Sequence, residues 1–177
     1  MPPELVPPLV KAALLLIFPA LAIIGGLKDM ISFTIPNWIS LALLAAFFPT
    51  ALILGVPLAQ IGLSAGVGAL ALVGGMAMFA LGWIGGGDAK LFAAAGLWLG
   101  WPAVFPFVII TGLCGGALAV SLLALRSMYL RPIASAGPAW FGRLAVPGGD
   151  VPYGVAICAG ALAAFPGSLL ALSFPGF

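Results

Sequence analysis

Long apolar stretches, separated by short polar breaks, make up nearly the whole chain. No charged side chain occurs from Met30 to Gly87, and none from Leu91 to Leu125. A stretch of about 20 apolar residues is long enough to cross a bilayer as a helix. The pattern therefore predicts an all-α polytopic membrane protein, a bundle of six transmembrane helices in one membrane-embedded domain over residues 1–177. The expected spans are about 11–27, 38–54, 58–83, 88–101, 103–125 and 152–174, with a polar-leaning loop at 126–151.

The fourth predicted span is short for a bilayer. Its 14 residues rise about 21 Å at 1.5 Å per residue, which is less than the hydrocarbon thickness. Gly100, Trp101 and Pro102 follow it and predict a tight turn into the fifth span.

Positive charge is distributed unevenly between the two sides of this predicted bundle. Six spans place the loops around 28–37, 85–90 and 126–151 on one side, and the opposite side carries Lys11 alone. The positive-inside rule makes the basic side cytoplasmic and both termini external. Trp98 and Trp101 are expected near the outer boundary. The cations on the cytoplasmic side are Lys28, Lys90, Arg126, Arg131 and Arg143.

The first apolar segment has a second interpretation. Ala20-Leu21-Ala22 resembles a signal-peptidase site behind an apolar run. The four prolines and the glutamate before that run are not a basic leader, and cleavage would leave an odd number of spans. We therefore favour an uncleaved first helix.

The composition leaves few groups for chemistry. The chain is 64% apolar and 6% charged, with a mean hydropathy of +1.30. It contains no histidine, which excludes Ser-His-Asp and Cys-His catalysis and removes the commonest zinc ligand. Cys114 and Cys158 lie in separate apolar segments without CxxC spacing and are interpreted as packing residues. We expect no cofactor and no metal. The carboxylates are Glu4, Asp29, Asp88 and Asp150.

Two of these acids are predicted at the same membrane boundary. Asp29 ends the first span and Asp88 begins the fourth, directly after Gly85-Gly86-Gly87. Each acid alone is compatible with a structural role at a helix end. Two carboxylates about 4 Å apart, however, repel by about 4 kcal/mol at an effective dielectric of 20, so the pair would hold one proton. Such a pair can activate water, and the glycines would admit a substrate backbone closely.

The same residues resemble the motifs of the type IV prepilin peptidases, in particular the short form associated with tight-adherence (Tad/Flp) pili. Residues 85–90, GGGDAK, match a GxGDxK motif that is shared in its GxGD core with intramembrane aspartyl proteases. Ile35-Pro36-Asn37 follows Asp29 as IPN follows the family's first aspartate, and residues 151–157, VPYGVAI, are similar to its PYGxAI segment. The three motifs occur in order over nearly the whole chain.

The resemblance implies an aspartyl endopeptidase that removes the leader of a type IV (Flp-like) prepilin at the cytoplasmic face of the bacterial inner membrane. Asp29 and Asp88 would be the catalytic pair. The partners would be the prepilin and membrane lipids, without nucleic acid, and the oligomeric state stays open. Residues expected to shape the site are Gly85, Gly86, Gly87, Lys90, Pro36, Asn37, Pro152, Tyr153 and Gly154.

This chain departs from the family pattern in two respects. Members commonly carry basic residues between the first aspartate and IPN, where this chain has residues 30–34, MISFT. The larger bifunctional members carry paired CxxC motifs, which this chain lacks. Methyltransferase activity is therefore not expected.

Three further residues near the predicted site also have expected roles. Lys90 points to a different helix face from Asp88, and reaching toward lipid phosphate is favoured over tuning of that acid. Asp150 is predicted to cap the sixth span, because proline at position 152 suits a first helical turn. Tyr153 either bonds near the acids or belongs to the interfacial aromatic belt.

Two other functions compete with the peptidase. A small proton- or ion-coupled transporter would use the same acids as a relay, but such sites usually lie at the midplane between structural repeats, and the chain shows no repeat. A catalytically silent scaffold would need only close helix packing, which GxxxG pairs favour. The chain has four such pairs, Gly62/Gly66, Gly82/Gly86, Gly96/Gly100 and Gly112/Gly116.

Overall fold

The computed structural model describes residues 6–174, and every regular element in that part of the chain is helical. The predicted all-α fold is thus confirmed. The predicted external location of the two termini concerns residues outside the described range. The elements are α1 (Pro8–Ser32), α2 (Asn37–Ile53), α3 (Leu58–Ala80), α4 (Gly86–Leu125), α5 (Arg131–Ser135), α6 (Ala139–Leu144), α7 (Tyr153–Ala164), the short 3-10 helix η2 (Phe165–Gly167) and α8 (Leu169–Leu172).

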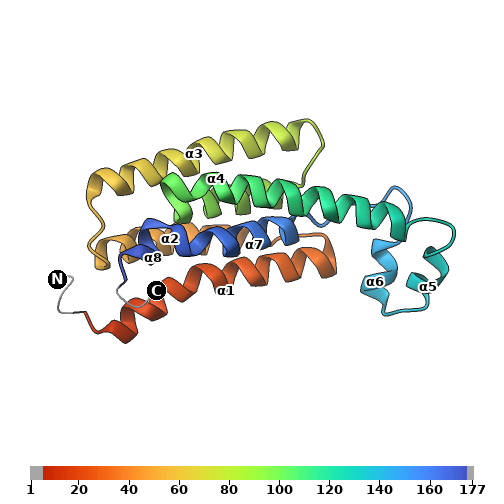
Figure 1. Ribbon diagram of the computed structural model, residues 1–177, viewed down its shortest axis with the longest axis horizontal. Helices are drawn as coiled ribbons and strands as arrows, with labels where there is room; N and C mark the ends of the chain where they lie inside the picture. The colour runs from red at the N-terminus through yellow and green to blue at the C-terminus, as the bar shows by residue number, and fades with distance from the viewer. Residues whose placement is uncertain (1–5, 175–177) are drawn as a thin grey trace.

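Helix α4 is two helical segments that fold back on each other. Gly100, at φ 59° and ψ −164°, and Trp101, at φ −92° and ψ 134°, are not helical. The rings of Phe92 and Phe107 lie 4.9 Å apart, although fifteen residues of continuous helix would separate them by about 22 Å. The turn predicted at residues 100–102 is therefore present, and it divides α4 into segments 86–99 and 102–125 (Figure 1).

The long helices lie side by side along the molecule (Figure 1). The end of α1, the loop from α3 to α4 and the start of α7 share one end, where α5 and α6 also lie. The loops that carry most of the positive charge therefore gather at this end. Segment 86–99 packs between α3, α2 and the second half of α4, so its first turn is surrounded by other elements.

The bundle has the surface of a membrane protein. Four described helices are long and apolar enough to cross a bilayer, namely Pro8–Ser32, Leu58–Ala80, Gly86–Leu125 and Tyr153–Leu172. Helix α2 is apolar but shorter, with 17 residues. Large apolar side chains such as Leu41, Leu70 and Val120 are exposed along these helices, as expected for contact with lipid.

An aromatic cluster forms the centre of the core. Trp98 is 1% exposed and stacks on Phe18 at 5.4 Å, while Phe47 meets its ring at 6.0 Å. The indole Nε1 donates to the Leu43 carbonyl oxygen at 2.9 Å, so the buried N–H is satisfied. The expectation of Trp98 in an outer aromatic belt is therefore wrong, whereas Trp101 is exposed. Phe18 lies in the segment considered as a cleavable signal and is fully buried in this cluster.

Arg126 fastens the loop between α4 and α7. Its Nε donates to the Leu144 carbonyl at 3.0 Å and its guanidinium donates to the Asp150 carbonyl at 2.7 Å. The predicted capping role of Asp150 is wrong. Helix α7 begins at Tyr153 with Pro152 at its N-cap, and no side chain caps it. Asp150 precedes the N-cap by two residues, and the chain turns at Pro152, where the Tyr153 N–H donates to the Val151 carbonyl at 2.8 Å.

Candidate active site

Three segments that are distant in sequence bring their ends together at the charged end of the bundle. Helix α1 ends at Ser32, and the chain turns at Phe33, whose φ of 52° is a left-handed conformation that bulky residues rarely adopt. The Phe33 N–H donates to the Asp29 carbonyl at 2.8 Å and closes the last turn. Asp29 therefore projects from a helix end that is fixed by its own backbone.

Asp29 is held by the start of α7. Its side chain is 4% exposed, and Oδ2 accepts the Gly154 backbone N–H at 2.7 Å, across 125 residues of sequence. A β-carbon on Gly154 would lie 2.8 Å from the Asp29 Cβ and 2.8 Å from the Ile35 Cδ1, closer than real β-carbons approach. Glycine at 154 thus lets the α7 backbone reach the carboxylate directly.

Asp88 is held by the turn that precedes its own helix. It is 6% exposed, and Oδ2 accepts the Gly85 N–H at 2.9 Å, as in a capping box. The other oxygen, Oδ1, is buried and accepts no hydrogen bond from the described residues. A buried carboxylate oxygen that is left unpaired is costly unless a ligand or water uses it, so Oδ1 is a candidate partner for a water molecule or a reactant that enters the site.

The two acids line the same pocket. The pocket has a volume of about 380 Å³. Both acids contribute to its lining, together with the Gly85 backbone that bonds to Asp88. The predicted meeting of Asp29 and Asp88 is therefore what the structure shows. The lining residues are Asp29, Phe33, Gly82, Trp83, Ile84, Gly85, Asp88, Gly149, Asp150, Val151 and Tyr153.

The three consecutive glycines before Asp88 are not equivalent. A β-carbon on Gly85 would lie 3.0 Å from the Asp88 Oδ2, and one on Gly87 would lie 3.0 Å from the Ile35 Cβ. A β-carbon on Gly86 would meet only the Phe79 ring, at an ordinary 3.5 Å. The close approaches thus explain glycine at the first and third positions of GxGD and leave the second position free.

A model of the type IV leader peptidase family matches residues 16–120, which is more than half of the chain. The chain belongs to this family. The match includes both Asp29 and Asp88, whereas Gly154 lies beyond it. No curated protein and no solved structure matches the chain significantly. The predicted family is confirmed, and a peptidase of prepilin leaders in the general sense is supported.

In this member of the type IV leader peptidase family, the PYG segment and the IPN segment have different tasks. Pro152 is fully buried at the start of α7, Tyr153 lines the pocket beside the acids, and Gly154 supplies the N–H to Asp29. Within IPN, Ile35 packs against Gly87 and Gly154, while Pro36 is the N-cap of α2.

Ile35 is a site residue that the sequence interpretation did not single out. Its side chain is buried, and it lies against both Gly87 and Gly154. It therefore sets the spacing between the start of α4, which carries Asp88, and the start of α7, which bonds to Asp29. The only sequence signal is its place within IPN, since isoleucine is otherwise ordinary in an apolar chain.

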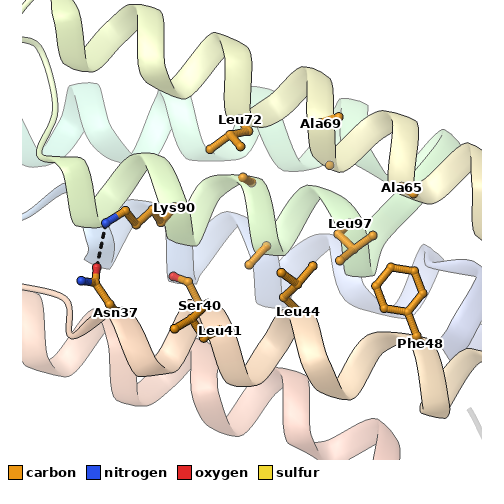
Figure 2. Close-up of a pocket in the computed structure, with 13 residues that line it drawn as sticks. Asn37, Ser40, Leu41, Leu44, Phe48, Ala65, Ala69, Leu72, Lys90 and Leu97 are labelled. Atoms are coloured by element: carbon orange, nitrogen blue, oxygen red, sulfur yellow. Dashed lines mark hydrogen bonds between the residues drawn. The ribbon is translucent and has the colours of Figure 1, made fainter.

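Lys90 and Asn37 belong to the opposite side of α4. The Lys90 Nζ donates to the Asn37 Oδ1 at 2.8 Å (Figure 2), and neither residue lines the pocket with the acids. The prediction that Lys90 and Asp88 occupy different helix faces is thus confirmed. The bond joins the start of α2 to the start of α4. It therefore helps to position the helix that carries Asp88, on the side of that helix away from the pocket.

Proposed function

We propose that the protein is an aspartyl endopeptidase that removes the leader of a type IV prepilin of the Flp-like kind, with Asp29 and Asp88 as its catalytic pair. The observation that carries this proposal is that two buried carboxylates from α1 and α4 line one pocket. Membership in the leader peptidase family supports the substrate class. The pilin-specific part rests on the motifs of residues 85–90, 35–37 and 151–157.

The proposed mechanism needs one proton on the pair and no cofactor. The ionised carboxylate takes a proton from water as the water oxygen attacks the carbon of the scissile peptide bond. The protonated carboxyl gives its proton to the carbonyl oxygen, which produces a tetrahedral diol. Collapse of the diol breaks the C–N bond: the proton taken from water passes to the leaving amine, and one diol hydroxyl returns its proton to the other carboxylate as the carbonyl group of the new carboxylic acid forms. The pair ends with one proton, as it began.

The proposed location is the cytoplasmic face of the bacterial inner membrane. Helices α1, α2 and α3, the two segments of α4, and α7 with α8 would form six spans. The basic loops at the pocket end support a cytoplasmic pocket. A prepilin would present its short basic leader there while its apolar helix stays in the bilayer. The pocket carries Asp29, Asp88 and Asp150 and so complements positive charge.

The test is leader removal in cells that express the chain together with a tagged Flp-type prepilin. Wild type is expected to yield the leader-less pilin, identified by mass. Asp29→Asn and Asp88→Asn are each expected to abolish the product while the protein still inserts. Asp150→Asn is the matched control, because it removes a negative charge from the same pocket but no proposed catalytic group, and cleavage should slow by a few-fold at most.

Processing that persists in either catalytic variant would remove that aspartate from the mechanism. Equal loss in all three variants would point to pocket charge as the requirement. Proton flux through vesicles in the absence of cleavage would favour transport.

A further inference from the structure

A groove of about 510 Å³ runs between α2 and α3, with segment 86–99 of α4 as its floor (Figure 2). The volume lies within the range of roughly 300–1,000 Å³ that is typical of ligand sites. No residue lines both this groove and the pocket of the two acids. The groove is lined by Asn37, Ser40, Leu41, Leu44, Phe48, Ala65, Gly68, Ala69, Leu72, Lys90, Ala93, Ala94 and Leu97.

Polar groups are concentrated at one end of the groove. Lys90, Asn37 and Ser40 lie there (Figure 2), near the starts of α2 and α4. Lys90 donates one hydrogen bond to the Asn37 Oδ1 and forms no ion pair with a described residue. The Asn37 amide nitrogen keeps both of its hydrogens for another acceptor. Asn37 is also the first residue of α2, where helix N–H groups favour an anion.

The apolar remainder of the groove has the length of one bilayer leaflet. From Asn37 to Phe48 the α2 side of the groove rises about 16 Å at 1.5 Å per residue. The hydrocarbon core is about 30 Å thick, so the groove ends near the midplane. Leu41, Leu44 and Phe48 are 62%, 47% and 42% exposed, which leaves the wall open to a hydrocarbon chain.

We propose that this groove binds an anionic phospholipid of the cytoplasmic leaflet, with one acyl chain between α2 and α3 and the phosphate on Lys90 and Asn37. A cation at the headgroup depth and an apolar channel one leaflet long match the two parts of such a lipid. A substrate helix fits less well, because it spans the whole bilayer and must deliver its leader to the pocket on the other side of α4. The lipid site is independent of the proposed peptidase activity.

Photo-crosslinking of the full chain in native membranes identifies the occupant. p-Benzoylphenylalanine replaces Phe48, the protein is expressed together with a prepilin, and the adduct is analysed by mass after irradiation. A phospholipid adduct is the expected result. An adduct to the pilin or to a second copy of the chain would overturn the proposal.

Retention of lipid by the purified protein tests the headgroup contact. The protein is exchanged into mixed phosphatidylglycerol and phosphatidylcholine micelles, and bound lipid is counted by native mass spectrometry. Lys90→Gln is expected to lower retained phosphatidylglycerol about fivefold without changing phosphatidylcholine. Lys28→Gln removes a cation that does not line the groove and should leave both unchanged. An equal loss in the two variants, or none in Lys90→Gln, would contradict the proposal.

Filling the groove tests the acyl contact. Ala69 is exposed and lines the groove, so Ala69→Leu should displace lipid of either headgroup. Ala77 is exposed on the same helix outside the groove, and Ala77→Leu is the matched control. Retention that is unchanged in Ala69→Leu, or equally reduced in both variants, would place the lipid elsewhere.

Discussion

Replacing Gly154 by alanine adds one methyl group at the contact that holds Asp29. The new β-carbon would lie 2.8 Å from the Asp29 Cβ, whereas ordinary contacts begin at 3.4 Å. The two backbones must therefore separate by about 0.6 Å, because the Asp29 Cβ is fixed to its helix. The Gly154 N–H is kept in alanine, so the variant changes the geometry of the hydrogen bond and not its chemistry.

The expected cost has two parts. Overpacking of this kind typically lowers stability by about 1–3 kcal/mol. A misplacement of about 1 Å in an active site costs on the order of a hundredfold in rate, so a shift near 0.6 Å should slow cleavage at least tenfold. The rate of leader removal per folded molecule, measured with purified protein in lipid, separates this effect from a loss of protein.

Two further glycine variants control the experiment. A β-carbon on Gly62 of α3 would have no neighbour within 4 Å, so the Gly62→Ala variant should cleave at the wild-type rate. Gly160→Ala on α7 is crowded by Thr111, away from the acids, and should lower thermal stability while keeping the rate per folded molecule. Cleavage by Gly154→Ala within twofold of wild type would refute the claim that the α7 backbone positions Asp29.

Three other predictions follow from the packing. Gly87→Ala should slow cleavage at least tenfold, because its β-carbon would lie 3.0 Å from the Ile35 Cβ, whereas Gly86→Ala should remain active. The reverse order of activities in a cleavage assay would contradict the account of GxGD. Trp98→Phe should lower the unfolding temperature, since it removes a buried hydrogen bond worth about 0.5–1.5 kcal/mol and part of a ring packed in the core, and unchanged thermal unfolding would argue against that bond. Arg126→Gln should speed protease cutting within loop 127–151, and an unaltered digestion pattern would mean that other contacts hold the loop.

The sequence was sufficient to predict the features that depend on a strong contrast between apolar residues and charged or helix-breaking ones. Apolar runs and their breaks predicted the helices and the turn at Gly100, and the rarity of charge drew attention to Asp29 and Asp88. The positions of both acids at one boundary followed from the order of the helices alone. These features depend on local composition, which a sequence displays directly.

Features that depend on which apolar residue faces inward could not be predicted. In a membrane protein the lipid side is as apolar as the core, so no polar face distinguishes the two. Trp98 was therefore expected at the membrane boundary but is at the centre of the core. The same ambiguity hid Ile35 among many similar residues, so the contact between Gly87 and Ile35 could not be predicted either. Asp150 was misassigned because the chain turns at Pro152, so the N-cap of α7 lies two residues later than expected.

The central claim is that Asp29 and Asp88 act as one unit, and the most direct test is a double-mutant comparison of cleavage rates. Purified wild type, Asp29→Asn, Asp88→Asn and the double variant are measured with excess enzyme in lipid, so that one turnover is followed. Residues that act as a unit give non-additive effects, so the double variant is expected to be no slower than the slower single variant. Losses that multiply in the double variant, or a single variant that cleaves at the wild-type rate, would contradict the claim.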